Sequence, residues 1–405
     1  MRYKSSFYNI CTRGKKGYVV YNTLYNTLVR MDEGEYSAFC FKEEASSEFA
    51  HQLVSLGLWV EEHIDEKERY ISLAGIIRSM NSHPYSVTIA TTMQCNARCS
   101  YCYETGVTQL PMSLQTESKL IEFLSQLDTG SGIHITWFGG EPLMNPGLID
   151  RVSTALTQKE IRFSSYLISN GSLINSDIID RMNNLWNTKD VQITLDGIGD
   201  VYDRRKNYVS GEKYFVKILD TISELCERGI FVHIRLNISR DNVEDSIELA
   251  EFLEKRFSQY NNLCYYPAFL TGVHDNLSDI ERSEIVSRML EKNTTASKLT
   301  ISRRLHSIPK IRPCMYTDPF SFSVDINGII HNCEHNLGHS DRAIGTIDNF
   351  EAGLQKHEFL LEEECKSCVY LPKCMGGCTS ERNSGECGCM VDKYLIQAYL
   401  RSISL

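Results

Sequence analysis

The sequence predicts an α/β protein built around a partial (β/α)6 barrel, with a small α+β domain before it and a cysteine-rich domain after it. Three observations support this prediction. Between residues 86 and 267, strand-like and helical segments alternate, which is typical of a parallel sheet with helical crossovers. A hairpin pattern stands near the N-terminus, and eight of the fifteen cysteines fall in roughly the last quarter of the chain. We therefore place domains at residues 1–80, 81–300 and 301–405.

Length and charge exclude several classes of protein. A chain of 405 residues exceeds what one hydrophobic core usually supports. The formal net charge of -10 argues against a nucleic-acid partner, which would normally require a basic face. The sequence has no apolar run of membrane-spanning length and no secretory signal, so we predict a cytoplasmic protein that binds no membrane. In a reducing cytoplasm, fifteen cysteines indicate metal ligation rather than disulfides.

The N-terminal segment carries strand signals at both ends. Residues 7–12 and 18–22 flank the turn-forming stretch 13–17, which predicts a β-hairpin. Residues 58–64 and 70–73 are then expected to form a closing pair of strands.

Two short helices are expected between these strands. Asp32 is a suitable N-cap for the first. In the second, Phe49, Leu53 and Leu56 recur at helical spacing, and Gly57 ends the pattern.

The predicted barrel has apolar segments of strand length and amphipathic segments of helix length. Apolar stripes at 120–127 and 215–225 indicate two of its helices, and residues 392–400 indicate a final helix after the barrel. In such folds the chemistry lies in loops beyond the C-terminal ends of the strands. The six predicted strands are residues 86–91, 133–138, 165–169, 191–195, 232–237 and 263–267.

A group of three cysteines follows the first predicted barrel strand. Cys95, Cys99 and Cys102 form a Cys-x3-Cys-x2-Cys arrangement on a loop. Three thiolates can hold three irons of a [4Fe–4S] cluster and leave the fourth iron open for another ligand. The alternatives are a zinc site or structural thiols. Structural zinc requires four closed ligands, and no fourth Cys or His is close in this loop.

With this motif the chain resembles the radical S-adenosylmethionine (SAM) superfamily over about residues 86–267. Gly139, Gly140 and Glu141 follow the second strand, as the Gly-Gly-Glu of that family does. The resemblance implies that the cofactor binds the open iron and is reductively cleaved to methionine and a 5′-deoxyadenosyl radical, which abstracts hydrogen from a substrate. Glycines would let the backbone approach the methionine moiety, and Glu141 would accept a hydrogen bond from its ammonium group.

Further cofactor contacts are implied at the ends of later strands. Asn-Gly and Asp-Gly are also common turns, so a turn without ligand remains the alternative. Tyr101 is expected to pack against the adenine side, with a simple core aromatic as the alternative. If the enzyme forms formylglycine on a sulfatase, Asp196 or a neighbouring carboxylate is the candidate catalytic base. The polar residues implied as cofactor contacts are Ser169, Asn170, Thr194, Asp196, Arg235 and Asn237.

The C-terminal cysteines resemble the SPASM domain, which carries two auxiliary [4Fe–4S] clusters; a multi-zinc fold is the alternative. With the radical SAM cluster, the resemblance implies three clusters. It assigns Cys314, Cys333 and Cys378 to the first auxiliary cluster, and Cys365, Cys368, Cys374 and one late cysteine to the second. We choose Cys389 as this late ligand, because Lys393 follows it as in the Cys-x3-Lys of the family. Cys387 remains unassigned. The first auxiliary cluster either takes Cys387 or keeps an open iron.

Four cysteines lie outside both groups. Cys226 stands on the helical stripe near Leu225, and a buried small hydrophobe is the expected role of the whole set. These cysteines are Cys11, Cys40, Cys226 and Cys264.

The N-terminal domain resembles the winged-helix peptide-recognition element fused to many maturases of ribosomally made peptides. Such an element binds a leader peptide as an added strand at a sheet edge. The alternative is a domain that only stabilises the barrel.

The predicted function is therefore a radical SAM peptide maturase. Its expected partners are a precursor peptide and an electron donor such as flavodoxin or ferredoxin. A thioether crosslink is the expected product, while carbon–carbon crosslinking and epimerisation stay open. Formylglycine formation on a sulfatase is the alternative enzyme activity, and an electron-transfer or scaffold protein is the alternative without catalysis.

Overall fold

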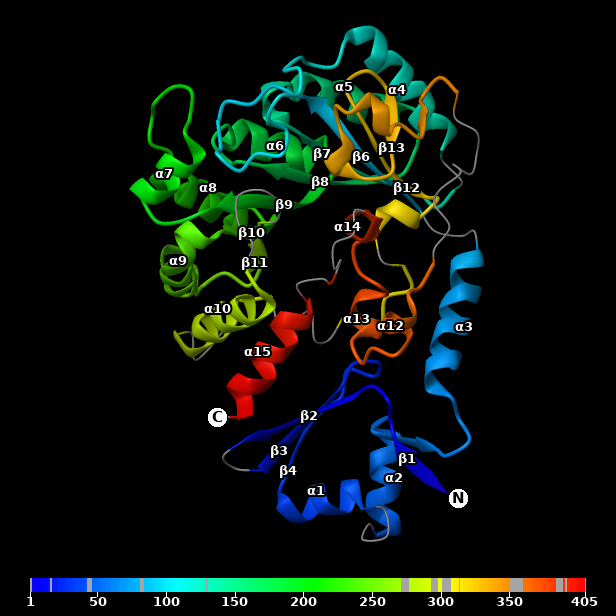
Figure 1. The fold of residues 1–405 in the computed structure, drawn as a ribbon. Helices are drawn as coiled ribbons and strands as arrows, with labels where there is room; N and C mark the ends of the chain where they lie inside the picture. Colours follow the sequence, from blue (N-terminus) through cyan, green and yellow to red (C-terminus); the bar gives the residue numbers. More distant parts are fainter. Residues whose placement is uncertain are drawn as a thin grey trace. The chain divides into compact units, whose positions relative to one another are not determined.

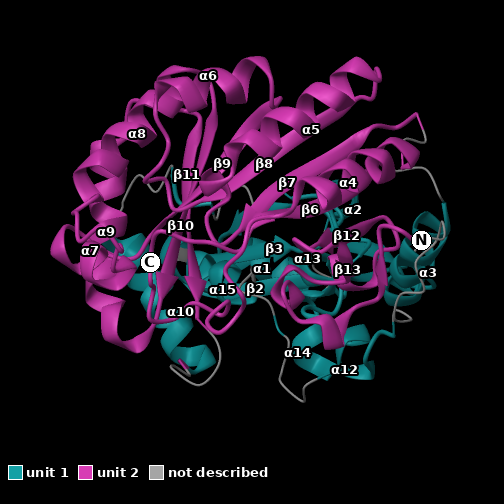
Figure 2. Cartoon of the chain, turned by 90° about the horizontal axis from the view of Figure 1, so that it is seen from above, with its two compact units in different colours: residues 1–81, 278–314, 358–405 teal, residues 82–277, 315–357 magenta. Residues whose placement is uncertain are grey.

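The computed structural model divides the chain into two compact units (Figures 1 and 2). The first unit comprises residues 1–81, 278–314 and 358–405, and the second comprises residues 82–277 and 315–357. The three-domain division stays a prediction. No helix within the described residues is long and apolar enough to cross a membrane. The structure describes residues 2–14, 17–41, 46–80, 84–127, 130–270, 277–292, 298–300, 307–312, 314–349, 360–383, 389 and 392–404.

The second unit contains the predicted parallel sheet. All six predicted strands are present, they pair in parallel in the order of the chain, and helices alternate with them. The strands are β6 (Tyr85–Thr92), β7 (Ile133–Gly139), β8 (Phe163–Ser169), β9 (Thr188–Leu195), β10 (Phe231–Ile238) and β11 (Leu263–Phe269). The helices are α4 (Leu114–Gln126), α5 (Pro146–Gln158), α6 (Ser176–Asn184), α7 (Asp200–Lys206), α8 (Phe215–Glu227) and α9 (Val243–Arg256).

Side-chain alternation explains how the sheet has two different faces. In β7 the odd-numbered residues, such as Ile135 and Trp137, are buried, whereas the even-numbered ones are partly exposed. Figure 2 shows the helices α4, α5, α6 and α8 along one side of the curved sheet. The buried residues of β7 therefore pack toward the helices, and the alternate residues line the inner face of the barrel.

Three strands after residue 310 extend this sheet, which the sequence analysis did not predict. β12 (Ser321–Val324) pairs in parallel with β6, and β13 (Ile329–His331) and β14 (Gly345–Thr346) continue antiparallel. Each is four residues or shorter, so its sequence gives almost no periodic signal.

The first unit contains the predicted hairpin. β2 (Asn9–Gly14) and β3 (Gly17–Asn22) pair antiparallel, and β4 (Leu28–Met31) adds to β3. The two predicted helices follow as α1 (Glu33–Cys40) and α2 (Ser47–Ser55). Asp32 is confirmed as an N-cap, because its side chain accepts from Glu35 N while the Glu35 side chain accepts from Asp32 N.

The predicted closing strand pair is wrong in its second half. Residues 70–73 lie in the helix α3 (Glu66–Ser79), and β5 (Trp59–Glu61) pairs instead with β1 (Tyr3–Ser5). Asp65 starts the helix by accepting hydrogen bonds from Lys67 N and Glu68 N. The following charged residues favour a helix, and this preference prevails over the apparent alternation at 70–73.

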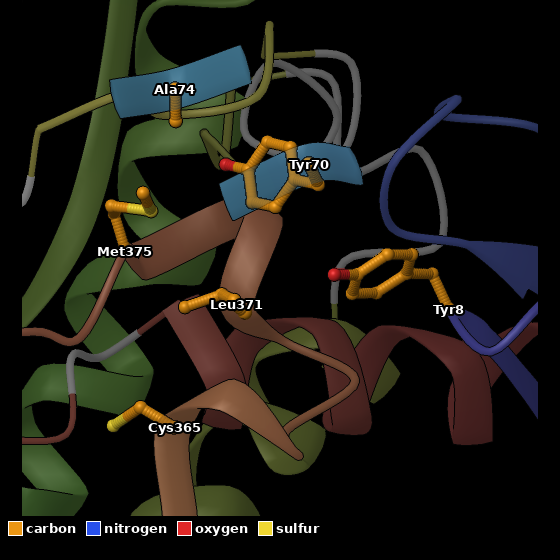
Figure 3. Packing of buried hydrophobic residues seen from close by; sticks show 6 residues of the cluster. All are labelled: Tyr8, Tyr70, Ala74, Cys365, Leu371 and Met375. Atoms are coloured by element: carbon orange, nitrogen blue, oxygen red, sulfur yellow. The ribbon is translucent and has the colours of Figure 1, made fainter. Parts of the chain in front are cut away.

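The first unit also brings N-terminal residues against the cysteine-rich segment (Figure 3). Tyr8 and Tyr70 belong to one buried cluster with Cys365, Leu371 and Met375. The remaining helices of this unit are α10 (Asp279–Lys292), α12 (Glu363–Lys366), α13 (Leu371–Cys374), α14 (Thr379–Asn383) and α15 (Asp392–Ser404), which confirms the final helix.

Candidate active site

The three-cysteine loop follows β6 and is held by backbone hydrogen bonds from the end of α7. Arg98 N donates to Lys206 O at 3.0 Å, Val209 N donates to Asn96 O at 2.9 Å, and Ala97 forms an isolated bridge with Tyr208. These contacts fix the loop at the C-terminal end of the parallel strands, where barrel chemistry is expected.

Burial makes the thiols of this loop reluctant to ionise. It raises the pKa of Cys95 to about 12, although a hydrogen bond from Ala97 N to its Sγ opposes the shift, and it also raises the pKa of Cys102. A bound cation reverses this preference, because metal ligation requires thiolates. No three Cys, His, Asp or Glu side chains of the described residues are arranged to hold a single metal ion. The ligands of a four-iron cluster bind different irons and therefore lie farther apart than the ligands of a single ion. The three cysteines thus remain a suitable set of donors for such a cluster.

The Gly-Gly-Glu segment after β7 contacts the beginning of the cysteine loop through its backbone. Gly140 N donates to Thr92 O at 3.1 Å, and Glu141 N donates to Gln94 O at 2.8 Å. A Cβ atom at Gly139 would lie 2.1 Å from Thr92 O, and one at Gly140 would lie 2.5 Å from Gln94 O. Both glycines are therefore required by the close approach of two backbone segments.

The Glu141 carboxylate is fully buried and held by three donors. Its Oε1 accepts from Leu143 N at 3.1 Å and Ser169 Oγ at 2.9 Å, and its Oε2 accepts from Asn170 N at 2.8 Å. Burial raises the pKa of Glu141, and these hydrogen bonds oppose the shift. The Ser169 hydroxyl is thus used to orient Glu141, and Oε2 retains room for a further donor.

A side-chain chain that the sequence analysis missed joins the third strand end to the cysteine loop. Asn170 Nδ2 donates to Asn96 Oδ1 at 2.8 Å, Asn96 Nδ2 donates to Ser172 Oγ at 2.9 Å, and Ser172 Oγ donates to Asn170 Oδ1 at 2.6 Å. Asn96 lies inside the motif, so its position beside Cys95 was the only available signal.

Asp196 and Lys206 form a buried ion pair, and Tyr101 is hydrogen-bonded to both. Lys206 was not predicted from the sequence. Lys206 Nζ lies 3.2 Å from both Asp196 Oδ2 and Tyr101 Oη, and Tyr101 Oη donates to the same carboxylate oxygen. The side chains of Asp196 and Lys206 are 0% and 4% exposed. Burial alone would lower the pKa of Lys206, but the charge of Asp196 raises it well above its usual range.

The free oxygen of this carboxylate provides a test of whether a ligand fits. Asp196 Oδ1 is buried, and no partner for it is found among the described residues; Glu104 Oε1 is in the same state. Unpaired buried acceptors are costly, so both favour a bound group that supplies N–H or O–H donors. The amino and hydroxyl groups of S-adenosylmethionine are donors of that type.

The remaining predicted cofactor contacts lie on adjacent strands. Thr194 of β9 and Arg235 of β10 are register partners, and Arg235 Nε donates to Asn237 Oδ1 at 2.9 Å. Side chains of partners in a parallel sheet point to the same face, so Thr194, Arg235 and Asn237 share the inner face of the barrel.

The late cysteines occur in both units. In the first unit, burial raises the pKa of Cys374, and the charges of Cys368 and Cys365 raise it further. Burial also raises the pKa of Cys378, and the charge of Cys314 adds to this shift. Cys389 is partly exposed in the same unit. Arg382 Nη2 lies 3.3 Å from Cys365 Sγ.

Two predictions about the other cysteines must be corrected or set aside. Cys11 and Cys40 are exposed, so the predicted burial is wrong for both, because Cys11 lies on the edge strand β2 and Cys40 ends the helix α1. Cys226 and Cys264 are buried as predicted. Cys333 belongs to the second unit. Cys387 lies outside the described residues.

Comparison with protein families identifies the barrel. Residues 89–253 match the radical SAM superfamily. This stretch begins in β6 and includes the cysteine loop, the Gly-Gly-Glu segment and Asp196.

Among curated proteins, the sporulation killing factor maturation protein SkfB of Bacillus subtilis (strain 168) is 27% identical over 55% of this chain and 50% of its own length. The chain thus spans about half the length of the curated relatives it matches first.

Two solved structures share the fold. The structure of anSMEcpe with bound AdoMet and the Cp18Cys peptide has a TM-score of 0.64 at 15% identity, covering 79% of this chain and 99% of that one. Streptococcus suis SuiB bound to the precursor peptide SuiA has a TM-score of 0.55 at 14% identity, covering 97% of this chain and 100% of that one.

Proposed function

We propose that this chain, a radical SAM enzyme, is a maturase that modifies a precursor peptide. The observation that carries the proposal is the coverage of the fold likeness. It extends over 97% of the chain for the peptide-bound SuiB structure, against 79% for anSMEcpe, and therefore includes most of the predicted N-terminal domain, residues 1–80. The similarity to SkfB, a maturation protein, supports the same class of activity.

At the radical SAM site, Cys95, Cys99 and Cys102 would hold a [4Fe–4S] cluster, which with S-adenosylmethionine supplies a 5′-deoxyadenosyl radical. Glu141 would accept a hydrogen bond from the cofactor ammonium through its Oε2. The unpaired Asp196 Oδ1 would accept another. We propose Ser169 and Asn170 as positioning residues, since both hold the Glu141 carboxylate.

We propose that the cysteines after residue 310 hold two auxiliary [4Fe–4S] clusters with the ligands predicted above. The proximity of Cys365, Cys368 and Cys374, and of Cys314 and Cys378, supports this assignment. Anaerobic reconstitution should give about twelve irons per chain, falling to about eight when Cys95, Cys99 and Cys102 are replaced by Ala. Zinc in place of iron, or unchanged iron in the triple variant, would contradict the assignment.

The proposed product is a thioether between a cysteine sulfur and a carbon of the peptide. To form this bond, the 5′-deoxyadenosyl radical would take the hydrogen atom of the C–H bond, and the thiol would lose its proton to solvent. One electron is then left over, so the step needs an electron acceptor. The auxiliary clusters are suitable acceptors, with flavodoxin or ferredoxin as the outside electron partner.

The test uses a short cysteine-containing peptide encoded beside the gene, incubated with reconstituted enzyme and S-adenosylmethionine. A thioether removes two hydrogens from the peptide and blocks the cysteine from alkylation. The same mass loss with a cysteine that can still be alkylated would indicate a carbon–carbon crosslink. If the peptide loses no hydrogen but takes up one deuterium from deuterated solvent, the reaction is an epimerisation. Turnover of a sulfatase peptide alone would overturn the proposal in favour of formylglycine formation.

The N-terminal sheet is the proposed leader-binding element. β4 is an edge strand of the β2–β3–β4 sheet, and an edge strand can accept an added strand through its main-chain groups. Deleting the leader half of the peptide should weaken binding while leaving cofactor cleavage intact.

A further inference from the structure

Three side chains at the beginnings of neighbouring barrel strands form a continuous hydrogen-bonded chain. Cys264 Sγ on β11 lies 3.4 Å from His233 Nδ1 on β10, and His233 Nε2 lies 3.0 Å from Asp190 Oδ1 on β9. None of the three belongs to the cysteine groups or to the cofactor contacts described above.

Strand register explains why these residues meet. His233 is the direct partner of Cys264, and Asp190 pairs with Phe231, two positions before His233. Side chains two positions apart on a strand share a face, so all three side chains project to one face. Arg235 projects to this face too, which is the inner face of the barrel.

The two hydrogen bonds determine which nitrogen carries the proton. An ionised carboxylate only accepts, so His233 Nε2–H must donate to Asp190. In the neutral ring Nδ1 then has a free lone pair and accepts from the Cys264 thiol. The imidazole is thus oriented by a carboxylate and positioned to take the thiol proton, as a base beside a nucleophile must be.

We propose that Cys264, His233 and Asp190 form a second reactive site, in which Cys264 is a nucleophilic thiol that reacts with small disulfides. The sulfur of Cys264 attacks one sulfur of the disulfide, its proton passes to His233 Nδ1, and the other half leaves as a thiolate. One S–S bond breaks and one forms, so atoms and electrons balance without a further oxidant.

The surroundings of the site limit the size of the reagent. The side chains of Asp190 and His233 are 45% and 26% exposed, whereas Cys264 is only 2% exposed. The rings of Phe231 and Tyr166 lie 4.8 and 5.8 Å from that of His233. Because the sulfur itself is almost fully covered, we expect only a small disulfide, and not a protein, to reach it beside the partly exposed His233 and Asp190.

Cys226 provides a matched control in the same unit. It is also buried, at 5% exposure, but its thiol lies 4.0 Å from the Asn262 carbonyl oxygen, which is a weaker base than an imidazole. If Cys264 were only a small core hydrophobe, the two thiols would react alike.

The experiment treats the reconstituted full-length protein, under anaerobic conditions, with the small disulfide cystamine and maps modified cysteines by mass spectrometry. We expect Cys264 to be modified at least about tenfold faster than Cys226 at neutral pH, as ionisation beside a base implies. His233→Phe should reduce this rate to that of Cys226, and Asp190→Asn should have a smaller effect.

Equal rates for Cys264 and Cys226 in the unaltered protein would overturn the proposal without any variant. So would an unchanged Cys264 rate in a folded His233→Phe protein. Iron content and cofactor cleavage serve as folding controls, since neither depends on this site.

Discussion

Replacing Lys206 by Met should strongly destabilise the barrel unit. Lys206 Nζ is the cation beside Asp196, and both side chains are at most 4% exposed. Removing one partner of a buried ion pair leaves an uncompensated charge and typically costs about 3–5 kcal/mol. With a urea dependence of about 3 kcal/mol per molar for a domain of this size, the midpoint should fall by roughly 1–2 M.

The measurement is urea unfolding of the apoprotein, followed by tryptophan fluorescence, because Trp137 and Trp186 are buried in the barrel unit. The double variant Lys206→Met with Asp196→Asn should recover much of the loss, since no charge is then left unpaired. Lys213→Met is the matched control. Its partner Asp200 and Lys213 itself are 79% and 72% exposed, so little change is expected.

If Lys206→Met unfolded at the same urea concentration as the unaltered protein, the buried ion pair would not stabilise the barrel unit. A double variant less stable than the single one would also contradict the prediction. The first result would mean that water or a neighbouring group already compensates the charge of Asp196, and the second that the Asp196 carboxylate stabilises the unit through other contacts, such as the one with Tyr101.

Three further predictions concern the supports of the two cysteine regions. Glu141→Gln should slow cofactor cleavage at least about tenfold, measured as 5′-deoxyadenosine release. The amide N–H₂ of Gln would face backbone donors, and each buried mismatch of this kind costs about 1–3 kcal/mol. An unchanged rate would count against a role for the carboxylate. Gly140→Ala should lower the iron content, because the new Cβ would lie 2.5 Å from a backbone oxygen. Gly75→Ala is the control and should leave the iron content unchanged, because the atom nearest to its new Cβ is 3.8 Å away. Equal iron in both variants would show that the backbone adjusts. Lys373→Met removes the buried ammonium that donates to Asn26 Oδ1 and to Ser307 O. It should lower the thermal midpoint by a few degrees, corresponding to about 1–2 kcal/mol. An unaltered midpoint would show that these two hydrogen bonds do not contribute to the stability of the first unit.

The sequence was most informative where the signal is local. The six barrel strands repeat a short apolar pattern, and Asp32 caps a helix with a side chain three residues from its partner. Cysteine spacing likewise reports chemistry, because a cluster requires several thiolates on one short loop.

Local signals failed where two patterns competed or where the element was too short. Residues 70–73 alternate like a strand, yet the Asp65 cap and the charged turn after it select a helix. β12 pairs with β6, and nothing in the four residues of β12 indicates which strand they pair with.

The alternation of strands and helices, the cysteine motifs and the Gly-Gly-Glu segment can all be recognised from the sequence, since each depends on residues that are neighbours along the chain. Which polar side chains meet is known only from the tertiary structure. Cys264 and His233 are 31 residues apart, and His233 and Asp190 are 43 apart, yet parallel pairing brings them within hydrogen-bonding distance. Asp196 follows β9 and Lys206 ends α7, so their pairing depends on how the loop between these two elements folds. Such contacts depend on how strands and loops pack in space, and no periodicity in the sequence encodes them.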